Sequence, residues 1–189
     1  MNDFVSTGLI ALGSNLPQPE GAPTANLARA LREMTAQGLV IRLISRFFET
    51  PCFPEGTGPD YVNAAVSVAT RLSPAEVLEV LHGIEADMGR TRETRWGMRS
   101  LDLDLIACDD MVLPDAPTVQ NWVDLPSHEQ RVRAPDELVL PHPRLADRAF
   151  VLVPLHDIAP HWRHPMTGLD VGQMLAALPA SDIDAVRPI

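Results

Sequence analysis

The sequence contains no lysine, so all 15 of its basic residues are arginine. This absence excludes a Walker-type phosphate-binding lysine, the lysine of protein kinases and a Schiff-base lysine. Any side chain that clamps phosphate must therefore use the planar guanidinium fork of arginine. Cysteine is nearly absent too: Cys52 and Cys108 are the only two, which is too few to suggest a disulfide framework.

Long apolar runs are also missing, and the first residues lack the basic start and apolar core of a signal peptide. We therefore expect a cytoplasmic protein without a membrane partner. The formal net charge of −10 argues against a nucleic-acid partner, because such surfaces are usually basic. The remaining composition, with 46% hydrophobic residues in a chain of 189, predicts a single globular domain over 1–189. Nothing in the sequence identifies a protein partner.

Two aspartates alternate with leucines in the segment 101–105, L-D-L-D-L. This period-2 pattern is typical of a half-buried strand, with Asp102 and Asp104 on one face, about 6.5–7 Å apart. Two like charges at this spacing call for a divalent cation or arginines beside them. Four arginines precede the aspartates, at positions 90, 92, 95 and 99. Each pattern alone is common on solvated surfaces, but together they favour chemistry on a Mg²⁺–polyphosphate substrate.

Strand and helix patterns alternate along the chain. Strands are predicted at 8–13, 39–50, 61–70 and 101–105, and helices at 24–37 and 73–88, the second of these opened by a capping box with proline. The β-α-β-β-α-β order predicts an α+β fold, a ferredoxin-like α/β sandwich whose mostly antiparallel sheet has helices packed on it.

The second half of the chain is less regular. Short strands are predicted at 111–113 and 138–140, and a short helix at 169–178; the segment 151–158 fits either a helix or a strand. The polar, proline-bearing residues 114–135 predict a loop insertion, and the last ten residues predict a frayed end. The charged segment 89–100, poor in apolar anchors, is expected to close over the substrate as a lid.

Several motifs in a fixed order resemble one enzyme family. They are G-S-N (13–15), T-P (50–51), P-D-Y-V-N-A-A (59–65), I-E-x-x-x-G-R (84–90), R-W-G-x-R-S-L-D-L-D-L (95–105) and L-P-H-P-R-L-x-D-R-A-F-V-L-x-P-L (140–155). Over most of residues 7–160 the chain resembles the 6-hydroxymethyl-7,8-dihydropterin pyrophosphokinases of folate biosynthesis. The resemblance implies a Mg²⁺-dependent transfer of pyrophosphate from ATP to the hydroxymethyl oxygen of the pterin, with release of AMP.

The resemblance also implies roles for individual residues. Two Mg²⁺ ions would be held by Asp102 and Asp104. The residues expected to bind ATP are Glu85 near the adenosine and, at the phosphates, Arg90, Arg99, His142 and Arg148; of these, Arg90 and Arg99 are also expected to be catalytic together with the two aspartates. The residues expected to bind the pterin are Thr50, Pro51, Phe53, Tyr61, Asn63, Trp96 and Phe150.

The residue types partly support these roles by themselves. Tyr61 and Asn63 share one strand face, and an aromatic ring beside an amide suits a flat heterocycle with a donor–acceptor edge. Pyrophosphoryl transfer needs positioning and charge neutralisation rather than a covalent nucleophile. The chain departs from the family's usual pattern at residues 52–55 and at Pro143, next to the expected pterin and ATP contacts.

Two other functions also fit parts of the pattern. A metal-dependent nucleotidyltransferase also combines a Gly-Ser pair with D-x-D, but there the two elements lie close in sequence, whereas Ser14 and Asp102 are far apart. A ferredoxin-like regulatory module would bind a ligand without chemistry, and would need neither Mg²⁺ nor Asp102.

Overall fold

The computed structural model describes residues 5–17, 21–52, 58–89, 100–130 and 133–189. Within them, a six-stranded sheet runs in the order β5-β1-β4-β3-β6, and β2 also pairs with β4. Every pairing in it is antiparallel. The strands are β1 (Ser6–Ser14), β2 (Val40–Ile44), β3 (Phe48–Thr50), β4 (Tyr61–Thr70), β5 (Asp102–Cys108) and β6 (Arg187–Pro188).

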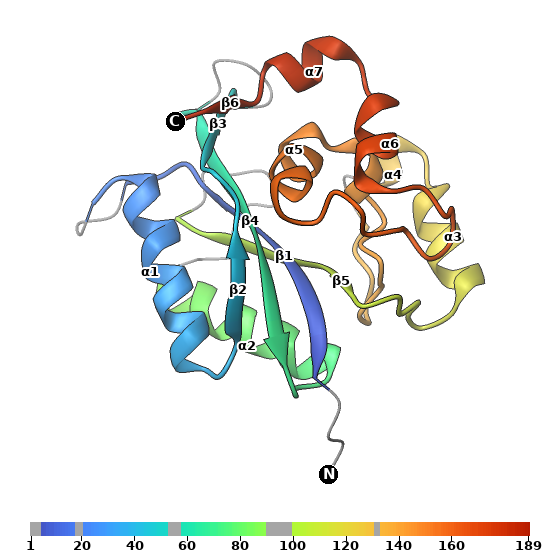
Figure 1. The fold of residues 1–189 in the computed structure, drawn as a ribbon, viewed down its shortest axis with the longest axis horizontal. Helices are drawn as coiled ribbons and strands as arrows, with labels where there is room; N and C mark the ends of the chain where they lie inside the picture. The colour runs from blue at the N-terminus through green and yellow to red at the C-terminus, as the bar shows by residue number, and fades with distance from the viewer. Residues whose placement is uncertain (1–4, 18–20, 53–57, 90–99, 131–132) are drawn as a thin grey trace.

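One face of this sheet is covered by α1 (Pro23–Ala36) and α2 (Pro74–Asp87), as Figure 1 shows. Buried leucines and valines of β1, β4 and β5 meet the apolar faces of these helices in the largest core cluster. At the start of α2, Ser73 and Glu76 form the predicted capping box. The predicted β-α-β-β-α-β sandwich is therefore confirmed.

The opposite face is partly covered by C-terminal helices. The segment 151–158, which fitted either a helix or a strand, belongs to α5 (Ala149–Ile158), which packs on β4 and on α6 (Val171–Ala176). Buried side chains of α5 and α6 meet Leu9, Ala65 and Ile106 of the sheet in a second cluster. Helical spacing places Val151, Leu152 and Leu155 on the sheet side of α5. The site described below lies on this face.

The long strand predicted at 39–50 is interrupted between β2 and β3. At the break, the backbone N–H of Ser45 donates to the carbonyl of Ala65 (2.9 Å). The N–H of Ala65 donates to the hydroxyl of Ser45 (2.9 Å) rather than to a strand carbonyl. Because a side chain replaces a backbone partner, the ladder breaks here, and β3 restarts at Phe48.

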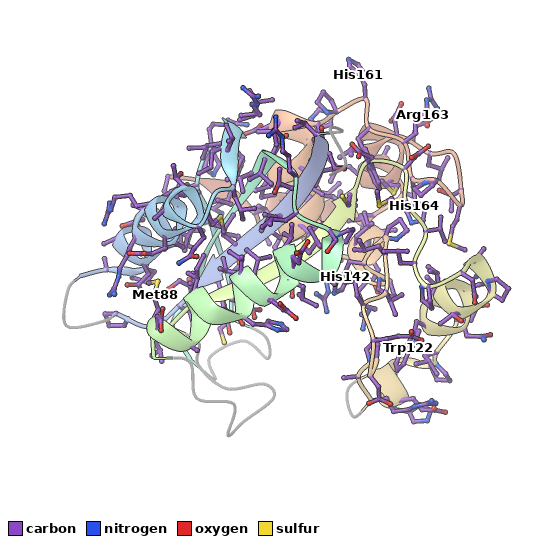
Figure 2. The ribbon with its side chains drawn as sticks, turned by 90° about the horizontal axis from the view of Figure 1, so that it is seen from below. Met88, Trp122, His142, His161, Arg163 and His164 are labelled. Atoms are coloured by element: carbon purple, nitrogen blue, oxygen red, sulfur yellow. The ribbon has the colours of Figure 1, made fainter. Side chains whose placement is uncertain are left out.

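The prediction of a loop at 114–135 was wrong, because this stretch contains α3 (Ala116–Val123) and α4 (Ser127–Gln130). Asp115 is the N-cap of α3, and its carboxylate accepts the N–H of Thr118 (2.8 Å). The guanidinium of Arg133 lies over the ring of Trp122, 5.5 Å from its centroid. Figure 2 shows Trp122 well apart from His142. The short strands predicted on either side are reduced to one bridge between Leu113 and Leu140.

The prediction that the last ten residues form a frayed end was also wrong. The predicted helix at 169–178 is the shorter α6, and α7 (Ala180–Asp184) follows it. The chain then pairs β6 with β3, and the N–H of Ile189 donates to the carbonyl of Phe47 (3.0 Å). In the described part of the chain, no helix has the length and apolarity that a bilayer crossing needs.

Candidate active site

One row of paired residues crosses three strands at the end of β1. Gly13 lies opposite Asn63 of β4 on one side and opposite Asp102 of β5 on the other. Directly paired residues of a sheet share a face. Neighbouring strands are about 4.8 Å apart, so about 10 Å separates the strand with the amide from the strand with the carboxylate. The row therefore brings an expected pterin contact and an expected metal ligand to the same face.

Gly13, which has no side chain, lets its neighbours pack closely in the middle of this row. A Cβ atom at this position would lie 3.0 Å from Oδ1 of Asn63, 3.9 Å from Cβ of Asp102 and 4.0 Å from Cδ1 of Tyr61. Three of the residues expected at the site therefore converge on a residue without a side chain. Asn63 and Asp102 therefore flank Gly13 on the same face of the sheet.

The amide of Asn63 is held in place by β3. Its Nδ2 donates to the hydroxyl of Thr50 (2.7 Å), and both residues are buried. Thr50 is paired with Tyr61, which begins β4. A fixed amide beside a half-buried aromatic ring can read the donor–acceptor edge of a heterocycle. The next residue, Pro51, is exposed.

The second aspartate meets the residues of α5. Nη1 of Arg148, the N-cap of α5, lies 4.0 Å from Oδ2 of Asp104, whose side chain is 38% exposed. The same guanidinium lies over the ring of Phe150, 5.7 Å from its centroid. Burial lowers the pKa of Arg148 from its ordinary value, and Asp104 opposes that shift. Arg148 therefore links the carboxylate pair to an aromatic ring that is 41% exposed and open to stacking.

His142 approaches the site from the other side of β5. Its backbone N–H donates to the carbonyl of Ile106 (2.8 Å), two residues beyond Asp104. Its Nδ1 accepts the N–H of Arg144 (3.1 Å), so the proton of the neutral ring is on Nε2. Burial, followed by the charge of Arg148, lowers the pKa of His142 to about 3. The ring is therefore a neutral N–H donor at physiological pH.

This lowered pKa predicts a stability change with pH. The unfolded chain binds a proton at His142 below about pH 6.5 while the folded chain does not, so acid favours unfolding. We expect wild type to lose about 1–2 kcal/mol more unfolding free energy than His142→Gln between pH 7 and pH 5, measured by urea unfolding. The same substitution at His128, on the surface of α4, is the control. Parallel pH profiles for wild type and His142→Gln would contradict the prediction.

Glu85 holds two elements together. It is only 2% exposed on α2, and its Oε1 accepts the N–H of Leu103 on β5 (2.8 Å). The bond fixes β5 against α2 between Asp102 and Asp104. The structure thus gives Glu85 a contact within the fold, whereas its expected place near adenosine stays a prediction.

Two substitutions separate these roles. Glu85→Ala should lower the unfolding free energy by about 1–3 kcal/mol, because the buried N–H of Leu103 loses its acceptor. Glu85→Gln keeps an acceptor oxygen and should cost less in a urea titration. A raised KM for ATP in Glu85→Gln would support the adenosine contact. Equal destabilisation by both substitutions would show that the bond to Leu103 contributes little.

Sequence reasoning missed a buried polar cluster beneath the row. The hydroxyl of Ser14 donates to the carbonyl of Ser100 (2.6 Å) and accepts from Nδ2 of Asn26 (3.0 Å). Asn26 also reaches the carbonyl of Ser100 (3.1 Å), just before β5. The G-S-N motif was the available signal, although it fitted a simple turn equally well. Ser14 is fully buried, and its hydroxyl bonds to groups within this cluster.

Asp102 and Asp104 are the described residues best placed to hold a metal ion. The structure contains no group of three or more His, Cys, Asp and Glu side chains suited to a metal, within the residues it describes. Two carboxylates on an open face fit Mg²⁺, which takes few protein ligands and keeps positions for phosphate and water. Four residues expected at the site lie outside the described ranges: Phe53, Arg90, Trp96 and Arg99. So does nearly all of the expected lid.

Comparison with known proteins identifies the family. A family model described as 7,8-dihydro-6-hydroxymethylpterin-pyrophosphokinase (HPPK) matches residues 9–160. A Methylorubrum extorquens protein named 2-amino-4-hydroxy-6-hydroxymethyldihydropteridine pyrophosphokinase is 35% identical over 179 residues, which are 94% of this chain and 97% of the relative. The chain belongs to the HPPK family. The HPPK of the same name from Synechocystis is 34% identical over 96% of this chain and 79% of its own.

Solved structures agree with this membership at the level of the fold. Wild-type Plasmodium falciparum HPPK-DHPS matches with a TM-score of 0.62 and 14% identity over 92% of this chain. An HPPK-DHPS in complex with substrates matches with a TM-score of 0.63 and 13% identity over 91%. This HPPK-family chain spans 44% and 43% of those two proteins, respectively.

Proposed function

We propose that the chain transfers pyrophosphate from ATP to the hydroxymethyl oxygen of 6-hydroxymethyl-7,8-dihydropterin and releases AMP, a step of folate biosynthesis. Membership of the HPPK family supports this activity. The observation that carries it in the structure is the row Asn63–Gly13–Asp102. In this row the amide of Asn63, proposed to bind the pterin ring, lies about two strand spacings from the carboxylate of Asp102. The hydroxymethyl group of the pterin could therefore react beside that carboxylate.

The pterin would lie over Gly13 with its amide-like edge at Asn63. Tyr61 would stack on one side of the ring and Phe150 on the other, since both rings are at least partly accessible. This placement directs the hydroxymethyl group toward Asp102 and Asp104. Thr50 contributes by holding the amide of Asn63 (2.7 Å). Pro51, Phe53 and Trp96 keep their proposed places in the pocket from the resemblance.

Asp102 and Asp104 would hold two Mg²⁺ ions, because their oxygens are hard donors on one face. Bound there, the ions would neutralise phosphate charge and lower the pKa of the substrate hydroxyl. The protein's own contribution is to fix both carboxylates on one face of β5, with Arg148 beside Asp104 (4.0 Å). The carboxylates are thereby aligned before the substrates bind.

Arg148 and His142 would bind the phosphates of ATP. The guanidinium offers two parallel donors to phosphate oxygens, and the neutral imidazole offers Nε2–H. Arg148 lies 4.0 Å from Asp104, and its charge also reaches His142, so the two side chains could contact the same phosphate group. Arg90 and Arg99 are proposed to contact the transferred phosphates, and Glu85 the adenosine, on the resemblance alone.

A product assay tests the function directly. Protein is incubated with ATP, Mg²⁺ and 6-hydroxymethyl-7,8-dihydropterin, and the nucleotides are separated by ion-exchange chromatography. We expect AMP and pyrophosphorylated pterin in equal amounts, only when Mg²⁺ is present. Release of inorganic pyrophosphate with a nucleotidylated pterin would indicate a nucleotidyltransferase. Absence of turnover with intact ligand binding would indicate a regulatory module.

A further inference from the structure

The end of the chain returns to the sheet beside the proposed acceptor pocket. β6 pairs with β3, with Pro188 opposite Phe48 and Arg187 opposite Glu49. Figure 1 shows this C-terminal strand running alongside β3, far in sequence but adjacent in space. These residues lie beyond 9–160, the part of the chain that the family model matches. Residues 186–189, called the tail below, therefore lie outside the part of the fold that carries the motifs.

The tail is fastened by a side chain as well as by pairing. Val186 is 8% exposed and packs with Phe48 (1%) and Ala149 (7%) in a small separate cluster. Phe48 is the residue opposite Asn63 in the pairing of β3 with β4. Ala149 is the first residue of α5, between Arg148 and Phe150. Val186 thus touches both elements that carry the proposed pocket.

A second tie joins the residues before β3 to the other end of α5. Arg46, just before β3, donates from Nε and Nη2 to the carboxylate of Asp157 near the end of α5 (2.9 and 2.8 Å). Its side chain is 63% exposed, so solvent weakens this pair. The buried contact of Val186 is therefore the firmer of the two ties.

β3 depends on such support because it is only three residues long. Without β6 its second edge would be unpaired, and Phe48 would lose a packing partner. Thr50 ends the same strand and holds the amide of Asn63. A shift of β3 against α5 would change how Thr50 and Asn63 lie relative to Phe150.

We propose that residues 186–189 position the acceptor pocket, an inference that rests on the function proposed above. By filling the space between β3 and the start of α5, the tail sets the separation between the amide and the exposed ring. Val186 is a positioning residue, since it packs with Phe48 and Ala149, neither of which is among the groups proposed to touch the pterin. Its effect belongs to acceptor binding, and ATP binding around Arg148 and His142 should change much less.

The test uses the full chain with Val186→Ala, which removes the packing but keeps the backbone pairing. Met174→Ala is the matched control, because Met174 is also buried (3% exposed) but belongs to the second cluster, in which α5 and α6 meet the sheet. Binding of the pterin is measured by fluorescence with Mg²⁺ and a non-hydrolysable ATP analogue present, and the ATP analogue is titrated separately. We expect Val186→Ala to weaken pterin binding about three- to tenfold, with ATP-analogue binding and kcat at saturation near wild type. Val186→Ile, which keeps a β-branched side chain, should bind the pterin with an affinity near that of wild type.

Deletion of 186–189 should weaken pterin binding more than Val186→Ala does. If Val186→Ala and Met174→Ala weaken it equally, or if Val186→Ala leaves it unchanged, the tail has no positioning role. Asn63→Ala distinguishes a failure of the proposed pterin pocket from a failure of the tail's role. Loss of pterin binding in Asn63→Ala but not in Val186→Ala overturns the role of the tail alone, whereas normal binding in both overturns the pocket itself.

Discussion

Replacing Asp102 or Asp104 with asparagine is expected to lower kcat about a hundred- to thousandfold or more, with the fold intact. Both side chains lie on the half-open face of β5, away from the core formed with α1 and α2. Asparagine keeps the size of the side chain but removes the charge that would hold Mg²⁺. Transfer of pyrophosphate depends on neutralising the triphosphate, so the loss falls on the chemical step.

The experiment measures AMP release over a range of Mg²⁺ concentrations, with circular dichroism to check folding. Asp110→Asn, on an exposed residue of the turn after β5, is the control and should keep wild-type turnover. Higher Mg²⁺ should partly restore the activity of the two site variants, because the remaining carboxylate still binds. Near-normal turnover in either variant at low Mg²⁺ would mean that metal binds elsewhere.

The elements around the site were predictable wherever local pattern determines structure. Alternation placed the leucines of β5 in the core and Asp102 and Asp104 opposite, and the residues at Ser73 and Glu76 marked the start of α2. These signals work because period and capping depend on neighbours in the chain. The break in the strand at Ser45 was not predictable, since it depends on Ala65, which lies across the sheet.

The site was predictable in composition but not in arrangement. Tyr61, Asn63 and the aspartates could be named from their strands, but their meeting depends on the register of β1 with both neighbours. That register makes Gly13 the centre of the candidate site, although its motif fitted a turn. Glu85 shows the reverse case: the resemblance implied a ligand contact, and the fold adds a bond to β5 that no local pattern reveals.

The C-terminal segment was misjudged for a related reason. Its composition is typical of a frayed end, and only the open edge of β3 gives it a partner. The helices within 114–135 were missed because their signals are short: Asp115 as a cap followed by Pro117 near the first turn. Pairing between distant segments is set by surfaces that exist only after the fold has formed.

Gly13→Ala is expected to raise the KM for the pterin about ten- to a hundredfold while leaving the KM for ATP near wild type. The added methyl would lie 3.0 Å from Oδ1 of Asn63, closer than such contacts normally come, so the amide must move. It would also project into the space over which the pterin is proposed to lie. Gly13 is not among the glycines with a positive φ, so the effect is steric rather than a strain of the backbone.

Gly8→Ala, on the same strand, provides a closely matched control. A methyl there would lie 3.1 Å from Cγ2 of Val68, a similar crowding, but on the core face of β1. Thermal unfolding should show comparable destabilisation of the two variants, whereas only Gly13→Ala should lose affinity for the pterin. If the two variants bind the pterin equally well, the acceptor does not lie across Gly13, and Asn63 and Asp102 do not serve one substrate.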